Sequence, residues 1–249
     1  MVATAQSPTA IKCPPTMVPV LCMATDAHPI VATSNDESEI KVPIVAVSHY
    51  NDGRVFCFAS IQMIAPPLLE SECTARFFKN LMKQILKNEN YMAPALLLDL
   101  NPRYESDVLK LFMGKASIDK GTFKNKFERY RIIVMTHDAT TSPETNTILF
   151  NYVSNGGTLI IFYETQNLFN NDESDENDNN CDNIINDLLI NFDLSFYVTS
   201  DVLRCSALRT VSIPSQYSDI RYCNFEKLAN HYKEILHEPN LTTEKLDET

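Results

Sequence analysis

The chain has 249 residues, of which 44% are hydrophobic and 21% charged, and its formal net charge at pH 7 is −11. A globular fold with a substantial core is expected, because folding buries roughly 70 to 75% of the surface of a chain of this size. The acidic balance argues against nucleic-acid binding, which needs clustered Lys and Arg. No apolar run reaches the roughly 20 residues of a membrane span, so we expect a soluble protein without membrane insertion.

The first part of the chain, residues 1–41, is rich in Pro and Thr and ends in an acidic, serine-containing stretch. This composition predicts a poorly ordered lead with one short strand at Val18–Met23.

From Val42 to Ile61, apolar and polar residues alternate on either side of Asn51-Asp52-Gly53. Asp-Gly readily supplies the positive φ of a tight turn, so this segment is predicted to be a β-hairpin.

A helix and a buried strand are predicted next. After Pro66-Pro67, apolar residues recur at helical spacing up to residue 88 and form one wide stripe. The stripe consists of Leu69, Cys73, Phe77, Leu81 and Ile85, flanked by Phe78 and Met82. The continuous apolar run that begins at Ala93 is typical of a strand buried on both faces, as in a parallel sheet, and a short helix is predicted at Glu105–Met113.

The segment from Tyr130 to Gln166 reads as a strand, a helix, a glycine turn and a second strand, which is one unit of a parallel α/β sheet. Asn155-Gly156-Gly157 is predicted to end the helix, because the residue past a helix end usually adopts the left-handed conformation. The acidic stretch 170–183 is interpreted as a solvated loop, and it is followed by a predicted helix and strand. A last helix is predicted at Asn224–His237, before a tail over residues 239–249. We therefore expect one α/β domain over residues 42–238.

Polar residues follow the three predicted strands at the edge where parallel sheets bind ligands. They are Asp99 and Asn101, then Thr136, His137 and Asp138, and finally Glu164 and Gln166. Two carboxylates and an imidazole could perform acid–base chemistry or hold a divalent metal. Polar residues also gather at strand ends simply as helix caps, and a histidine such as His137 is more often a capping or surface residue than a ligand. We treat the set as a candidate ligand crevice and assign no catalytic residue and no metal.

Common catalytic and cofactor motifs are absent from the sequence. His237-Glu238 begins an H-E-x-x-H pattern, but Leu241 occupies the second histidine position, so no zinc-peptidase helix is formed. The nucleophile elbow G-x-S-x-G and the phosphate-binding motif G-x-G-x-x-G do not occur. We expect no cofactor.

The cysteines and the N-terminus bear on the compartment. The seven cysteines are an odd number without a C-x-x-C pair, which predicts neither a zinc knuckle nor a redox dithiol, and Cys57 reads as a buried small hydrophobe. The N-terminus lacks the charged start and continuous apolar centre of a signal peptide. These features favour a reducing, cytoplasmic location.

Three segments together resemble a known family. They are the hairpin Pro43–Ser60, the unit Tyr130–Glu164 and the segment Ile185–Asp201. They resemble the N-terminal region of TRP channel-associated factors and enhancin-like metallopeptidases, over roughly residues 42–238. The resemblance implies a class I glutamine amidotransferase-like, flavodoxin-like fold, with a mostly parallel sheet between two layers of helices and an added β-hairpin.

The resemblance also implies a departure from amidotransferase chemistry. Catalytic amidotransferases present a cysteine after the strand that follows the Gly-Gly turn, whereas this chain has Glu164-Thr165 there. A glutamate cannot form the thioester that glutamine hydrolysis requires. The metallopeptidase domain of longer family members is missing from this sequence.

Three functional hypotheses follow. The first is a non-catalytic protein-binding module. By resemblance to channel-associated factors, its partner would be a membrane channel or a channel regulator. Such a partner would bring this cytoplasmic chain to the plasma membrane. The second is a hydrolase or small-ligand site that uses His137 with Asp99 or Glu164, which requires His137 and Glu164 to lie within about 10 Å of each other. The third is the leading domain of a truncated enhancin-like metallopeptidase.

Overall fold

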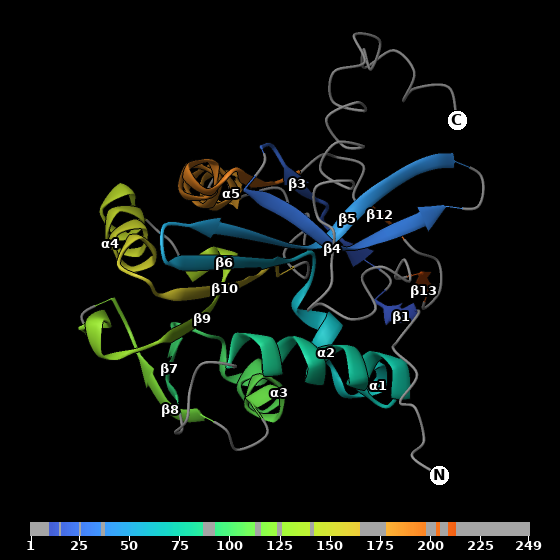
Figure 1. The fold of residues 1–249 in the computed structure, drawn as a ribbon, viewed down its shortest axis with the longest axis horizontal. Helices are drawn as coiled ribbons and strands as arrows, with labels where there is room; N and C mark the ends of the chain where they lie inside the picture. The colour runs from blue at the N-terminus through green and yellow to red at the C-terminus, as the bar shows by residue number, and fades with distance from the viewer. Residues whose placement is uncertain are drawn as a thin grey trace, which may run out of the picture.

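The computed structural model describes residues 10–14, 16–24, 26–35, 38–86, 93–112, 116–123, 126–139, 142–164, 178–197, 203–204 and 209–212. Its centre is a seven-stranded sheet (Figure 1). In spatial order the strands are β4 (Ala27–Asn35), β5 (Ser38–Tyr50), β6 (Gly53–Phe58), β10 (Thr158–Phe162), β9 (Ile132–Thr136), β7 (Ala93–Leu98) and β8 (Ala116–Gly121). The last five of these are mutually parallel, whereas β5 is antiparallel to both β4 and β6.

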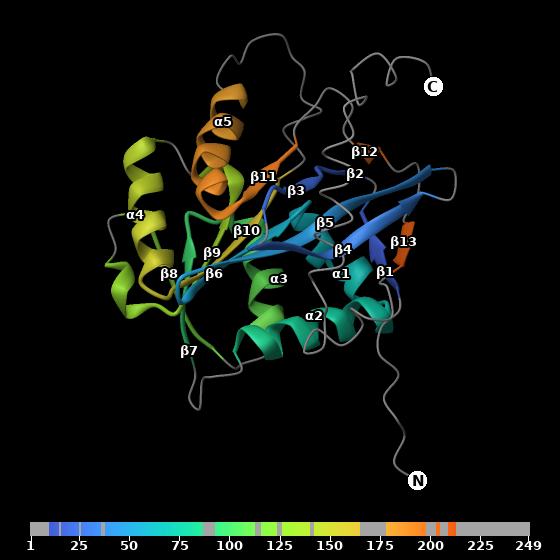
Figure 2. The same ribbon diagram turned by 45° about the horizontal axis from the view of Figure 1, so that its top comes forward.

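Helices cover both faces of the sheet (Figure 2). On one face lie α1 (Pro66–Leu69), α2 (Glu72–Ile85) and α3 (Pro102–Phe112), and on the other lie α4 (Pro143–Ser154) and α5 (Asp178–Leu189). Strands β6, β7, β9 and β10 contribute alternate side chains to the two cores, which is why β7, β9 and β10 read as continuous apolar runs. The expected α/β architecture is confirmed at this level. None of the helices in the described ranges is long and apolar enough to cross a membrane.

The order of the parallel strands bears on the finer fold class. Strands β8, β7, β9 and β10 follow the flavodoxin-like order 2-1-3-4 when they are numbered from β7. The fifth place, next to β10, belongs to β6, which precedes all of them in the chain. The sheet therefore departs from the flavodoxin-like order at one strand.

The predicted hairpin is present, but its turn works differently from the prediction. Asn51 and Asp52 form the turn between β5 and β6, and the positive φ, 52°, is at Asn51. Gly53 is needed for space: a Cβ there would lie 2.0 Å from the carbonyl oxygen of Val153, at the end of α4. The glycine thus lets the hairpin pack directly against that helix end.

The unit from β9 to β10 agrees with the sequence. Ser142 caps α4 in a reciprocal capping box with Thr145, and Gly156 has a φ of 92° just past the helix end. The predicted Gly-Gly stop signal is confirmed, because Gly156 takes the left-handed conformation and Gly157 lies against the ring of Tyr152.

The N-terminal lead needs correction. Where the sequence predicted poor order apart from one strand at Val18–Met23, the structure has three short strands before β4. These are β1 (Ala10–Cys13), β2 (Thr16–Met17) and β3 (Val20–Cys22), which pair with β13 (Arg209–Ser212), β12 (Leu203–Arg204) and β11 (Leu194–Phe196). The predicted strand corresponds to β3, whereas β1 and β2 were not predicted; all three pair with segments far along the chain. The division of the chain at residues 42 and 238 stays a prediction.

Smaller corrections concern the helices and one strand. The helix expected up to residue 88 is interrupted between α1 and α2, and Cys73 is exposed, whereas Thr74 is buried and accepts a hydrogen bond from the Lys12 N–H. Strand β8 was not predicted. The last part of the acidic stretch, residues 178–183, belongs to α5 and not to a loop. The helix predicted at Asn224–His237 lies outside the described residues.

A pair of glycine substitutions tests the hairpin packing. Gly53→Ala is expected to lower the free energy of unfolding by about 3 kcal/mol, because its Cβ meets backbone that cannot move without separating β6 from α4. Gly156→Ala is the matched control: its Cβ has 3.6 Å of room, so only the left-handed φ costs energy, about 1 kcal/mol. Urea unfolding measures both, and equal losses would contradict the packing argument.

Candidate functional site

The candidate crevice lies where the chain changes direction on the sheet. Neighbouring strands β7 and β9 send their following helices, α3 and α4, to opposite faces. In α/β proteins such a switch point leaves a crevice at the carboxyl ends of the strands. Residues that follow β7, β9 and β10 lie near one another at this edge of the sheet.

Glu164, two residues past β10, is buried at the carboxyl ends of the strands. Only 3% of its side chain is exposed, and it forms an ion pair with the guanidinium of Arg103. The Tyr104 hydroxyl donates a hydrogen bond to the same carboxylate oxygen, Oε1, at 3.2 Å. A buried carboxylate requires such partners, because removing it from water without them costs several kcal/mol.

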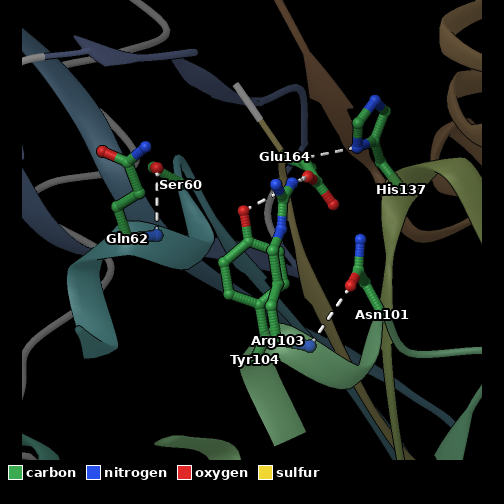
Figure 3. A network of polar contacts seen from close by, with 7 residues as sticks. All are labelled: Ser60, Gln62, Asn101, Arg103, Tyr104, His137 and Glu164. Carbon is green, nitrogen blue, oxygen red and sulfur yellow. Dashed lines mark hydrogen bonds and ion pairs between the residues drawn. The ribbon is translucent and has the colours of Figure 1, made fainter. Parts of the chain in front are cut away.

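The first turn of α3 positions both partners of Glu164 (Figure 3). The Arg103 N–H donates to Asn101 Oδ1 at 3.2 Å, and this bond fixes the start of the helix. The Arg103 guanidinium also stacks over the Tyr104 ring, 4.5 Å from its centroid. Although Glu164 is buried, 42% of the Arg103 side chain is exposed, so the ion pair forms the boundary between the crevice and solvent.

His137 follows β9 and is held on three sides. Its Nδ1 accepts a hydrogen bond from the Glu164 N–H at 3.0 Å, so the proton of the neutral ring resides on Nε2, which faces Asp182 Oδ1 at 3.6 Å. The ring stacks on Tyr163 at 3.9 Å, and the Tyr163 hydroxyl donates to the same Asp182 oxygen at 2.8 Å. The imidazole therefore links β9, β10 and α5.

The charge state of His137 follows from its environment. Burial lowers the pKa of His137 to about 4, against the opposing effect of the Asp138 charge. The ring is thus neutral at pH 7, and the Nδ1 lone pair is already used by a backbone N–H. A general base must have a lone pair available to the substrate, so this geometry suits a structural role for His137.

Several predicted site residues do converge. His137 and Glu164 are in direct contact, Asn101 lies beside Arg103, and the Asp138 charge acts on both His137 and Tyr104. Thr136 is buried at the end of β9. His137 is not a surface histidine, because it is buried and stacks on Tyr163.

Two predicted residues fall elsewhere. Asp99 has a φ of 45°, and its carboxylate accepts a hydrogen bond from the Phe123 N–H, on the side of β8. Burial raises the pKa of Asp99, and that hydrogen bond opposes the rise. The pairing of His137 with Asp99 is not seen, and Gln166 lies outside the described residues.

Sequence reasoning missed four members of the site, namely Ser60, Arg103, Tyr104 and Asp182. The Asn-Pro-Arg-Tyr segment after β7 could have indicated Arg103 and Tyr104, since it stands at the carboxyl end of a strand. Ser60 follows β6 and is buried, with its Oγ accepting from the Gln62 N–H at 3.2 Å to cap the η1 turn (Ile61–Ile64). In Figure 3, the side chains of Arg103 and Tyr104 stand between Ser60 and His137.

Other features in the described ranges offer little for catalysis. Within those ranges, no three His, Cys, Asp or Glu side chains are grouped so as to hold a metal ion. An apolar cavity of about 10 Å³ lies between the sheet and helices α2 and α3, lined by side chains such as Phe58, Phe78 and Val134. Its volume accommodates no more than one water molecule, so it is a packing defect in the core.

Comparison with known proteins shows the fold. No protein family model and no curated protein matches the chain. The IMPa metallopeptidase from Pseudomonas aeruginosa superposes with a TM-score of 0.58 at 10% identity, over 91% of this chain and 24% of that chain. Its complexes with T-antigen and with an O-glycopeptide both give a TM-score of 0.53, at 9% and 10% identity, over 92% and 93% of this chain and 25% of theirs.

The chain therefore spans about a quarter of the length of these neighbours. They are metallopeptidases, in agreement with that part of the family resemblance, and at this identity the likeness establishes the shared α/β fold alone. The channel-associated and amidotransferase-like parts of the resemblance stay predictions.

The buried histidine predicts a pH dependence of stability. The folded-state pKa of His137, about 4, lies below the ordinary value of 6.5, so between these pH values the unfolded chain binds the proton and the folded chain does not. The free energy of unfolding should fall as the pH drops from 6.5 to 4, by on the order of 3 kcal/mol from this group, and this contribution should be constant above pH 6.5.

The variant His137→Asn isolates this contribution. An asparagine Oδ1 can accept the Glu164 N–H in place of Nδ1 but does not titrate. The difference between the wild-type and variant unfolding curves should therefore show the slope. His28 and His49, whose pKa values burial also lowers, are present in both proteins and cancel. A flat difference curve would show that His137 is not buried as a neutral ring.

Proposed function

We propose that this chain is a non-catalytic α/β binding module. The observation that carries the proposal is the burial of Glu164 in an ion pair with Arg103. By the resemblance to amidotransferase-like domains, this residue takes the place of the nucleophile. A carboxylate neutralised by an internal guanidinium is a poor nucleophile and a poor general base, because both roles require a free lone pair directed at the substrate.

The neighbouring groups support the same conclusion. His137 and Glu164 meet the distance requirement of a hydrolase site, but the Nδ1 of His137 accepts a backbone N–H and its pKa is low. Ser60, the hydroxyl at the end of β6, is used to cap the η1 turn. The hydrolase hypothesis therefore has its residues nearby but not in a reactive arrangement.

The finer assignments belong to the proposal. The flavodoxin-like order of β8, β7, β9 and β10 supports a class I glutamine amidotransferase-like fold. The resemblance to channel-associated factors supports a protein partner, a membrane channel or a channel regulator, which would bring the chain to the plasma membrane. The cysteine content and the N-terminal sequence support a cytoplasmic location.

Stability and activity of Glu164→Gln test the proposal together. If the ion pair is structural, Glu164→Gln should lower the free energy of unfolding by about 1 to 3 kcal/mol, because Arg103 loses its charged partner. In a double-mutant cycle, the effects of Glu164→Gln and Arg103→Met should not be additive. Neither wild type nor variants should release ammonia from glutamine or hydrolyse a p-nitrophenyl ester. Turnover by the wild type that disappears in a fully stable Glu164→Gln protein would establish an enzyme instead.

A second candidate function rests on the structural neighbours. More than nine tenths of this chain superposes on a part of IMPa. The matching structures include complexes of IMPa with T-antigen and with an O-glycopeptide. We propose as the alternative that this chain is a domain of an enhancin-like metallopeptidase that positions a glycosylated substrate. Asn101 is exposed beside Arg103, and 42% of the Arg103 side chain is exposed, so both offer polar groups that can hydrogen-bond to sugar hydroxyls.

Titration with an O-glycopeptide that carries T-antigen tests this alternative. Saturable shifts of the Asn101 and Arg103 amide resonances are expected with the glycopeptide and not with the same peptide without sugar. The amide of Ile148, on the outer side of α4, serves as the internal control. Equal shifts with both peptides, or shifts spread over the whole chain, would exclude recognition of the sugar at the crevice.

A further inference from the structure

The end of the sheet opposite the crevice carries an apolar cluster that is partly exposed. The Tyr50 ring, at the end of β5, packs against Phe150 of α4 and against Phe192 of the η5 turn (Ile190–Phe192), with centroids 5.4 Å apart in both pairs. Ile190 begins that turn and is 55% exposed, and Met23, whose N–H donates to the Asp193 carbonyl at 2.8 Å, is 39% exposed. We call Met23, Tyr50, Phe150 and Ile190 the apolar patch.

Carboxylates surround the apolar patch. Asp52 lies in the turn after Tyr50, and Asp193 follows Phe192. Asp26 precedes β4, and its carbonyl accepts the His49 N–H at 3.1 Å. Burial and then the charge of Asp26 raise the pKa of Asp193, so the two carboxylates are close enough to repel each other.

Two helix ends add negative potential at the same place. Helices α4 and α5 lie side by side, and both end near the apolar patch, as the Phe150 and Phe192 contacts show. Their last turns, Asn151–Ser154 and Asn186–Leu189, contain no Lys or Arg by sequence. A Cβ at Gly156 would lie 3.6 Å from the Cβ of Asp52, which places this carboxylate at the negative end of the α4 dipole.

Among the residues that the structure describes, the basic groups nearest to the patch do not compensate this charge. Burial lowers the pKa values of His28 and His49, so both rings are neutral at pH 7. Arg54 directs its guanidinium to the Ile85 carbonyl of α2, on the other face of the sheet, at 3.2 Å. The charge of Arg131 acts on the Tyr152 hydroxyl. Tyr152 is two residues from Phe150, so its side chain points about 200° around α4 from the apolar patch.

We propose that the apolar patch and its rim of Asp26, Asp52 and Asp193 bind a partner protein segment in which apolar anchors are flanked by Lys or Arg. The apolar side chains supply buried area, and the basic residues neutralise carboxylates and helix ends that repel one another in the free protein. A second copy of this chain would bring like charges together, and an anionic lipid surface would be repelled, so charge selects a basic partner over both.

This inference rests on the proposed role of the chain as a binding module but uses a different surface from the crevice. The probe is a fluorescein-labelled amphipathic peptide of about 18 residues with leucines on one face and lysines on the other. Fluorescence anisotropy should show saturable binding that weakens about tenfold or more between 50 and 500 mM NaCl, because the contacts are charged. The same peptide with glutamate in place of lysine should not bind.

Surface variants locate the binding. Ile190→Ser and Met23→Ser should each weaken binding about fivefold or more, whereas Leu109→Ser on α3, with 40% exposure, is the matched control and should have no effect. Asp52→Asn and Asp193→Asn should each weaken binding about threefold, and Glu128→Gln, exposed in the η2 turn (Phe127–Arg129), should not.

The outcomes separate this inference from the proposed function. An equal loss of peptide binding in the control variants would mean non-specific attraction to an acidic protein and would overturn the assignment. Self-association of the chain that Ile190→Ser abolishes would also overturn it, because a second copy would then cover the patch. If the peptide fails to bind and the chain also turns over no substrate, only the surface assignment is wrong. Turnover of glutamine or ester would overturn the binding-module proposal itself, whatever the peptide does.

Discussion

The structure depends on how it keeps one negative charge, that of Glu164, in its interior. Burial of an unpaired carboxylate would cost several kcal/mol, and the Arg103 guanidinium together with the Tyr104 hydroxyl offsets this cost. The backbone N–H of the same residue holds His137. One residue thus connects the end of β10 to α3 through its side chain and to β9 through its main chain, and removing its charge would leave a guanidinium without its partner.

The sheet topology explains why these groups meet. Because α3 and α4 leave β7 and β9 toward opposite faces, neither helix covers the gap between the strand ends, and side chains must fill it. In an enzyme of this class the gap receives substrate. Here Glu164, Arg103, Tyr104 and His137 fill it with a network whose members bond to one another, so the same topology yields a polar structural core at this position.

The fold could be predicted wherever the signal was local. Continuous apolar runs indicated β7, β9 and β10, and Gly156 indicated the end of α4, because burial on two faces and a left-handed residue both leave direct marks in the sequence. Strand β1 left no such mark, since its partner is about 200 residues away in the chain. The role of Gly53 was likewise hidden, because it concerns the distance to the Val153 carbonyl and not the conformation of the glycine.

The candidate site was predictable in position but not in chemistry. Strand ends identified His137 and Glu164, since both follow apolar runs directly. Their meaning depends on Arg103, which comes from another strand end, and on Asp182, which belongs to a stretch that its composition assigned to a loop. Without those partners the same two residues indicate acid–base catalysis, and with them they indicate a neutral imidazole and a neutralised carboxylate.

The two ends of the sheet differ in how their charges are balanced. At the carboxyl ends of the strands, Glu164 is paired with Arg103 and Asp182 accepts a hydrogen bond from Tyr163, although the buried Oδ1 of Asp138 has no hydrogen-bond partner among the described residues. At the amino ends, Asp26, Asp52 and Asp193 lie beside two helix C-termini, and the cations near them turn to other faces.

Helix α5 joins the two ends: Asp182 near its start faces His137, and Phe192 just past its end packs under the apolar patch. Asn146 ties the same helix to α4 through the Ile184 carbonyl, at 2.6 Å. A partner that moved Phe192 would therefore act on the helix whose Asp182 faces His137.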